Sequence, residues 1–423
     1  MPYREPHFFI PSIYEHDINW AIKGFSVAAE RYTLQTPNKF IVDVDDKIYN
    51  VSAQQDIDLS VAASWDTQAP TDYTVAATRA GKDFYVYACQ PTSGAAVTLI
   101  ISANSTVPSG YTAANSRKIG GFHSLCVAVG TIGSHTLTGF VAGDILPASV
   151  WDLKHRPSCS PEGMTYDSKA NIWVDIYLTS GTGASTASVY GGTISDTRDW
   201  MDFTDDGGAV GKRMLKDNEF QLIAAGSNEE TNIVGSADPG TTGGHSDTAA
   251  RRMISNIGCE DCCGVMWQWL NEQSYRYDGG SHTHTFTGSA LATHQHDLAV
   301  IGSDAGPANA VLAADKLAKT DVSDVVVTGA DNPAGGGVKG ASAGTPAGTN
   351  AATDPLPAWA YYNLPGTKGS LYKQGTYGDV KLLAGAYWSD GADSGSRARY
   401  AGSYRWSTYA GIGCRLAAEP RVS

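Results

Sequence analysis

Two His-x-His units, His282-Thr283-His284 and His294-Gln295-His296, carry the clearest metal-binding potential in this sequence. In an extended strand, residues i and i+2 point to the same face, so each unit would present two imidazoles side by side. One chain could then offer four nitrogens to tetrahedral zinc, and three chains around an axis could offer six per unit to an octahedral metal. We expect iron or zinc at His282, His284, His294 and His296. The alternative is that these histidines are solvated in a Thr-rich loop.

The remaining potential catalytic groups point away from an enzyme. Cys259-Glu260-Asp261-Cys262-Cys263 contains a single Cys-x-x-Cys, which favours buried structural thiols over zinc. The sequence has no G-x-S-x-G, H-E-x-x-H, P-loop or dinucleotide-binding motif. We therefore predict no catalytic residues and no organic cofactor. Adjacent carboxylates such as Asp205-Asp206 and Glu229-Glu230 are interpreted as solvated loop charges, although sequence alone leaves a glycosidase pair open.

The segment from Gly385 to Arg415 has the composition of a binding surface. It reads GAYWSDGADSGSRARYAGSYRWSTYAGIGCR, and Ile412 is its one Leu, Ile or Val residue. Tyr and Trp provide large, stiff contact area at low entropic cost, while Ser, Gly and Asp provide adaptable polar contacts. The alternative is a Gly-rich β terminus in which the tryptophans belong to the core.

Composition narrows the possible partners. The formal charge of -13 is spread along 423 residues, so a nucleic-acid partner is not expected. Seven cysteines are few and odd in number, which indicates synthesis in a reducing compartment. The first residues lack the basic and apolar regions of a secretion signal, and no stretch approaches 18 apolar residues. We expect a soluble protein that does not insert into a membrane.

Hydrophobic patterns predict the elements that would carry these groups. Alternating runs at 47–51, 58–61, 84–88, 97–101 and 126–129 favour a small β-sandwich or barrel. Residues 171–178 predict a strand whose two faces are covered or paired. Helices are predicted at 216–225, with Gly226 as C-cap, and around 264–270. The Gly/Ala-rich stretch 273–355 cannot bury a core of its own and reads as a long insertion.

Four segments together resemble a known family. They are Phe140–Leu153, Trp173–Leu178, Asn218–Gln221 and Gly264–Leu270. The sequence is similar to phage tail-fibre receptor-binding proteins with a C-type-lectin-like (formylglycine-generating-enzyme-like) terminal domain. This group includes the major tropism determinant and other variable proteins of diversity-generating retroelements. The resemblance covers roughly residues 140–272 and 356–423.

The resemblance implies that a diversified C-terminal surface, residues 387–411, adsorbs the phage to a receptor on its bacterial host. Trp388, Arg397, Arg399, Trp406, Ile412 and Gly413 would form its framework. The receptor-facing residues that the resemblance implies are Ser389, Asp390, Asp393, Tyr400, Gly402, Ser403, Ser407, Tyr409 and Gly411. The composition of the segment adds Tyr387 and Tyr404 to this set. The His-x-His insertion departs from the compact family pattern and is similar to metal-binding trimeric tips of tail fibres. The related oxidase uses a cysteine pair near its C-terminal end, where this chain has only Cys414.

These observations predict a β-rich multidomain protein: an N-terminal β-sandwich-like domain followed by an α+β C-type-lectin-like domain with a long Gly/Ala-rich insertion. The predicted segments are 1–45 for attachment or oligomerisation, 46–142 for the β-sandwich-like domain, 143–272 and 356–423 for the lectin-like domain, and 273–355 for the insertion. The resemblance implies a homotrimer in the virion tail fibre, made in the host cytoplasm, with a host receptor (protein or glycan) and other tail-fibre proteins as partners. A glycan-active tail depolymerase and a purely structural virion protein are the alternatives.

The histidine pattern gives the first testable prediction. The natively purified full chain should be a trimer that carries iron or zinc in stoichiometric amount, because three chains can complete the ligand set around one axis. Elemental analysis together with the light-scattering mass checks this. A metal-free protein would contradict the metal site, and a monomeric mass would contradict the shared axis.

Overall fold

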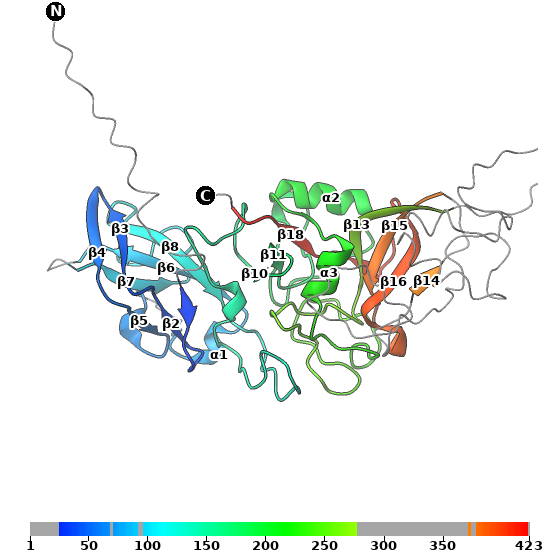
Figure 1. Cartoon of the computed structure of the whole chain (residues 1–423), viewed down its shortest axis with the longest axis horizontal. Coiled ribbons are helices and arrows are strands. Elements are labelled where there is room, and N and C mark those ends of the chain that lie inside the picture. Colours follow the sequence, from blue (N-terminus) through cyan, green and yellow to red (C-terminus); the bar gives the residue numbers. More distant parts are fainter. Residues whose placement is uncertain (1–24, 68–70, 92–95, 277–370, 374–377, 422–423) are drawn as a thin grey trace, which may run out of the picture. The chain divides into compact units, whose positions relative to one another are not determined.

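The computed structural model describes residues 25–67, 71–91, 96–276, 371–373 and 378–421. They divide into two compact units (Figure 1). The first unit contains the described residues up to 128, together with 140–163 and 420–421. The second unit contains 129–139 and the described residues from 164 to 419. Within the described residues, no helix is both long and apolar enough to cross a bilayer.

The first unit is built from small antiparallel sheets around one apolar core. A four-stranded sheet has the order β7-β6-β8-β9, a three-stranded sheet the order β1-β2-β5, and β3 and β4 form a hairpin. The strands are β1 Ser26–Val27, β2 Thr33–Gln35, β3 Phe40–Val44, β4 Lys47–Val51, β5 Asp56–Asp58, β6 Asp83–Cys89, β7 Thr98–Ser102, β8 Ser116–His123 and β9 Trp151–Asp152. The one α-helix of this unit's described residues is α1, Ala76–Arg79.

The first unit extends beyond its predicted boundaries. Residues 25–45, expected as an attachment segment, supply β1, β2 and β3, and Phe25, Leu34 and Phe40 are buried in the same core as Phe84. The sequence signal for β3 was its run of aromatic and β-branched residues, Phe40-Ile41-Val42-Asp43-Val44, which favours a strand. The unit also continues past 142, because Val150 belongs to its core. The run at 126–129 forms no strand, and the runs at 47–51, 84–88 and 97–101 coincide with β4, β6 and β7.

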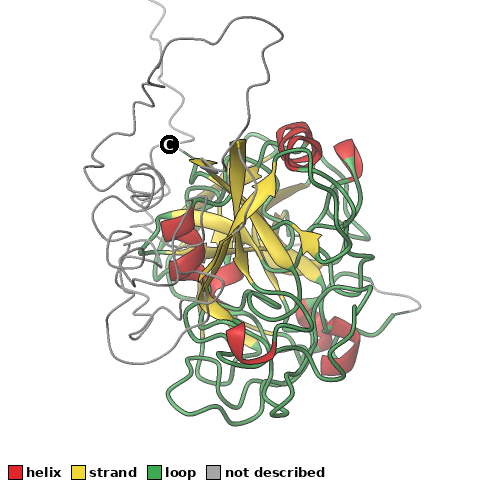
Figure 2. Ribbon diagram, turned by 90° about the vertical axis from the view of Figure 1, so that its right-hand side faces the viewer, coloured by secondary structure: helices red, strands yellow, loops and turns green. Residues whose placement is uncertain are grey.

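The described residues of the second unit form two sheets and two α-helices (Figure 2). One sheet has the order β10-β11-β18-β12, and the other has the order β14-β16-β15-β13-β17. The strands are β10 Met164–Asp167, β11 Ile172–Asp175, β12 Arg213–Met214, β13 Trp267–Arg276, β14 Leu371–Lys373, β15 Gly378–Gly385, β16 Gly395–Tyr404, β17 Ile412–Gly413 and β18 Leu416–Ala418. The helices are α2 Trp200–Ala209 and α3 Asp217–Ile223. Long loops surround the strands.

Helix α3 contributes to a core that both sheets share. Phe220 and Ile223 pack in one cluster with Val174 of β11, Leu270 of β13 and Leu382 of β15. The helix lies within the predicted range 216–225. Its C-cap is Ala224, two residues before the predicted Gly226, which adopts a left-handed φ of +86° just beyond the helix. Strand β11 lies between β10 and β18 and is buried along its length, so the strand predicted at 171–178 is present with both faces covered, but it ends at Asp175.

Two local predictions in the second unit were wrong. The segment 264–270, predicted as a helix, leads into strand β13, where Trp267 and Trp269 alternate with Gln268 at a period of two. Helix α2 was missed, although Asp199 and Asp202 form a capping box at its start: the Asp199 carboxylate accepts from Asp202 N at 2.9 Å. Its Asp206, expected in a solvated loop, is buried and paired with Arg198 at 2.7 Å.

Strand β16 is fixed to helix α3 by a buried ion pair. The Arg399 guanidinium donates to the carboxylate of Asp217, the first residue of α3, and lies over the Phe220 ring at 5.1 Å. It also donates to the carbonyls of Ser396 at 2.9 Å and Ala398 at 2.8 Å. Both charged side chains are nearly inaccessible to solvent. Successive side chains of a strand point to opposite faces, so this anchor directs Tyr400 the other way.

Removing this anchor should destabilise the second unit. We predict that Arg399→Ala lowers its free energy of unfolding by about 3–5 kcal/mol, because the Asp217 carboxylate is left buried without its cation. Denaturant unfolding measures this loss. Lys169→Ala is the control, since it removes a positive charge from an exposed side chain of the same unit and should change stability by about 0.5 kcal/mol or less. Equal stability of the two variants would contradict the role of the pair.

Candidate functional site

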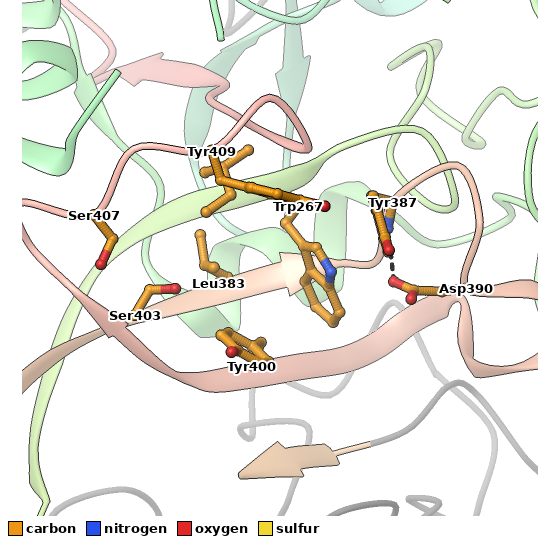
Figure 3. Close-up of a pocket in the computed structure, with 9 residues that line it drawn as sticks. Trp267, Leu383, Tyr387, Asp390, Tyr400, Ser403, Ser407 and Tyr409 are labelled. Atoms are coloured by element: carbon orange, nitrogen blue, oxygen red, sulfur yellow. Dashed lines mark hydrogen bonds between the residues drawn. The ribbon is translucent and has the colours of Figure 1, made fainter. Parts of the chain in front are cut away.

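A pocket of about 340 Å³ opens on the second unit between β13, β15, β16 and the loop that joins β16 to β17 (Figure 3). Its volume is in the range typical of small-molecule sites. The lining side chains combine aromatic rings, hydroxyls and one carboxylate. They are Trp267, Leu383, Tyr387, Asp390, Tyr400, Ser403, Ser407, Tyr409 and Ile412.

The floor of the pocket is apolar and firmly packed. Trp267, Leu383 and Ile412 are buried and belong to the same core cluster of the second unit. The Trp267 ring lies 5.8 Å from the Tyr400 ring, centroid to centroid. Tyr400 therefore has two roles, because it packs against this core and also faces the pocket.

The rim is more polar and more exposed. Tyr409 leaves 53% of its surface open to solvent, and its ring meets the Tyr387 ring edge-on at 6.2 Å. The backbone of the rim loop is held at both ends. At its first end, the N–H of Trp200, the first residue of α2, donates to Arg405 O at 2.9 Å, and at its last end Trp267 N donates to Gly411 O at 2.9 Å. Exposed side chains thus stand on a backbone that α2 and β13 hold in place.

Asp390 contributes the only carboxylate among the described residues that line the pocket. Its side chain accepts from Tyr387 N at 3.0 Å, and its own N–H donates to Tyr387 O at 3.2 Å. Burial raises the pKa of the Asp390 carboxyl to about 6, and the neighbouring Asp393 charge adds to this, whereas the Tyr387 N–H and the Trp267 side chain favour the ionised form. The charged form is therefore costly in the empty pocket.

A bend at the end of β15 brings this turn to the pocket. Gly385 has a φ of +95°, and the register between β15 and β16 shifts beside it. A Cβ at Gly385 would lie 2.4 Å from the Cys262 carbonyl oxygen, so both the backbone angle and the space require glycine. The bend turns the chain from the strand into the turn that contains Tyr387 and Asp390.

The structure brings six of the eleven predicted receptor-facing residues together around this pocket. They are Tyr387, Asp390, Tyr400, Ser403, Ser407 and Tyr409. Ser389 is exposed and Asp393 is half-buried in the same turn. Tyr404 is half-buried and stacks on Trp406, with the ring centroids 4.9 Å apart. Gly402 lies in β16.

Two residues exchange their expected roles. Gly411, expected on the variable surface, is buried, and a Cβ there would lie 2.7 Å from the Tyr387 ring and 2.9 Å from the Tyr409 ring. The absence of a side chain at Gly411 thus leaves the space that the Tyr387 and Tyr409 rings of the pocket wall occupy. Trp406, expected in the framework, has 55% of its surface exposed. Trp388 does pack against a buried cluster that includes Val265, and Arg397 and Arg399 are fully buried as expected.

Sequence reasoning missed the pocket floor contributed by Trp267 and Leu383. Trp267 lies in a segment that was predicted to be a helix, and a helix prediction does not pair this residue with the strands of the C-terminal segment. The available signal was the Trp-Gln-Trp alternation, which places Trp267 and Trp269 on the same side of a strand. Leu383 lies in β15, next to β13 in the sheet.

The predicted metal ligands His282, His284, His294 and His296 lie outside the described residues, so that site stays a prediction. Among the residues that are described, no three His, Cys, Asp or Glu side chains gather as a metal site requires. The thiols of Cys259, Cys262 and Cys263 are buried in the shared core, as the structural interpretation predicted. Burial also raises the pKa of the Cys414 thiol, which disfavours a reactive thiolate.

Comparisons with known proteins match the fold and the sequence. Residues 33–152 match the family model described as the Mtd second domain. A 228-residue stretch is 31% identical to the tail fiber receptor-binding protein of Bordetella phage BPP-1, covering 48% of this chain and 58% of that relative. The chain thus spans less than two thirds of the curated relative it matches.

Solved structures of the major tropism determinant share the fold. The M1 variant gives a TM-score of 0.58 at 23% identity, covering 94% of this chain and 83% of that one. The I1 variant gives 0.56 at 22% identity, covering 94% and 86%. These matches confirm the resemblance to the phage tail-fibre receptor-binding proteins. They also confirm the β-rich, C-type-lectin-like fold that the sequence predicted. The Bordetella phage relative is named as a tail fiber receptor-binding protein.

Proposed function

We propose that this protein is the receptor-binding protein of a phage tail fibre, and that residues 387–411 adsorb the virion to its bacterial host. The observation that carries this proposal is the pocket on the second unit, where six residues singled out by composition and resemblance surround an apolar floor. The tail fiber protein of Bordetella phage BPP-1 and the major tropism determinant structures support the same function.

The site divides its work between rigid and exchangeable positions. Buried Arg399 and Trp267 fix the backbone, and exposed Tyr409 and Ser389 can change without disturbing the core. Aromatic rings on such a frame lose little rotamer entropy when they bind. A few of these rings, Tyr409 foremost, would supply most of the binding energy, with the hydroxyls around them adding polar contacts.

An enzymatic role receives less support from the same pocket. Glycoside hydrolysis normally uses two carboxyl groups that flank the scissile bond. Asp390 is the single carboxylate among the described lining residues, so the pocket offers no described partner for it. The second alternative, a purely structural virion protein, would require the Tyr-rich segment to pack against a neighbouring subunit, with Tyr400 and Tyr409 buried between subunits.

The assembly is also part of the proposal. The chain would act as a homotrimer in the virion tail fibre, together with other tail-fibre proteins. Several identical sites on one particle convert weak single contacts into stable attachment wherever receptors are dense. The His-x-His metal site would belong to this assembly.

The pocket gives a direct test of the function. We predict that Tyr409→Ala reduces adsorption of the purified protein to host cells by about 5–150-fold, the range that a hot spot of about 1–3 kcal/mol implies. Its melting temperature should stay close to that of the unmodified protein because the ring is half exposed. Tyr400→Ala, by contrast, should also lower the melting temperature, since that ring packs on Trp267.

Tyr190→Ala is the matched control, because Tyr190 is an exposed tyrosine of the same unit that does not line the pocket. It should adsorb normally. Normal adsorption of Tyr409→Ala, or equal losses for Tyr190→Ala, would remove the pocket from the proposed function. Release of glycan fragments from host cells would instead favour a depolymerase.

A further inference from the structure

The charged side chain that lines the pocket is negative. Its described lining residues include the Asp390 carboxylate and no Lys, Arg or His. The groups that act on this carboxylate are Asp393 of the same turn, the Tyr387 N–H, the Trp267 side chain from β13 and the Tyr409 ring from the rim loop. None of these is a cation. The ionised carboxylate therefore lacks a positive partner among the groups that act on it.

The walls around this carboxylate are suited to a cation. Trp267, Tyr387, Tyr400 and Tyr409 bring four aromatic rings to one pocket. Each ring face carries a negative electrostatic potential, which attracts ammonium and guanidinium groups. Aromatic rings combined with a carboxylate discriminate against anions, because a second negative charge here would repel Asp390 and be desolvated. The volume of about 340 Å³ admits one side chain or one sugar unit.

We propose that this pocket binds a positively charged group of the receptor, an ammonium or guanidinium, against the Asp390 carboxylate and the surrounding aromatic rings. This inference rests on the proposed function, because it names the chemical class that the same site recognises. Two sources share this chemistry: a Lys or Arg side chain of a surface protein, and the amine of an amino sugar in a surface glycan.

The chemistry also predicts how adsorption depends on pH. A cation binds the ionised carboxylate, and the carboxyl of the empty pocket has a pKa of about 6. Adsorption through a Lys or Arg side chain should therefore strengthen as the pH rises through about 6 and level off towards pH 8. The amine of an amino sugar is a weaker base, so adsorption through it should rise in the same way but weaken again towards pH 8 as the amine loses its proton. Binding of a neutral or anionic group would be flat over this range, or would weaken as the pH rises.

Asp390→Asn is compared with Asp205→Asn as its control. Both variants remove one negative charge from the second unit, but only Asp390 lines the pocket, and Asp205 is exposed on α2, outside the segment 387–411. We expect Asp390→Asn to weaken adsorption to host cells at least tenfold at pH 7.5 and to abolish the rise between pH 5 and pH 8. Asp205→Asn should stay within about threefold of the unmodified protein and keep the rise. These variants are compared as purified full chains.

Melting temperatures separate lost recognition from lost folding. Because the native carboxyl of Asp390 has a raised pKa, it stabilises the fold at low pH and loses that contribution as the pH rises through about 6. Asp390→Asn should therefore melt no lower than the unmodified protein at pH 7.5, and its advantage should shrink towards pH 4.5. A folded Asp390→Asn that adsorbs normally would overturn the inference.

Soluble probes identify the source of the cation. N-acetyl-lysine methylamide and N-acetyl-arginine methylamide represent a protein receptor, and glucosamine represents a glycan amine, with N-acetylglucosamine as its neutral match. The inference is supported if at least one cationic probe reduces adsorption of the unmodified protein to host cells and has no such effect on Asp390→Asn. Competition by N-acetylglucosamine alone would overturn it. If Tyr409→Ala fails to adsorb while Asp390→Asn adsorbs normally, the receptor-binding role stands and only the cation is wrong.

Discussion

The buried ion pair between Arg399 and Asp217 is the interaction on which the candidate site depends most. It joins β16, which carries part of the pocket, to the first turn of α3, which packs between the two sheets of the second unit. A buried pair of this kind contributes little net stability but costs a great deal when one partner is lost. Its value here is positional, because it fixes which face of β16 points outward.

Arg415 performs a similar task at the end of the chain. Its guanidinium donates to the carbonyls of Asp175 at 2.8 Å and Ile176 at 2.6 Å, and to the side chain of Gln268 at 3.2 Å. It thereby joins the segment between β17 and β18 to both sheets. Two buried arginines thus bracket the exposed rim, and the rim residues can vary between them without loss of the backbone path.

The sequence could predict the site better than its scaffold. Tyr387, Asp390 and Tyr409 stood out because side chains that serve binding are exposed and distinctive in type. The floor was hidden because Trp267 is more than a hundred residues earlier in the sequence, and only sheet pairing brings it beside Tyr400. Gly411 was assigned to the variable surface, and Trp406 to the framework, because composition cannot distinguish a glycine that is needed for space from a glycine in a variable loop.

The central claim is that the rim of this pocket contacts the receptor. Oxidative footprinting of the full chain, free and adsorbed to host cells, tests this most directly, because Tyr409 and Tyr190 are both exposed on the same unit. We predict that adsorption lowers the modification rate of Tyr409 severalfold and leaves that of Tyr190 unchanged. Unaltered modification of Tyr409 in the adsorbed protein would contradict the account.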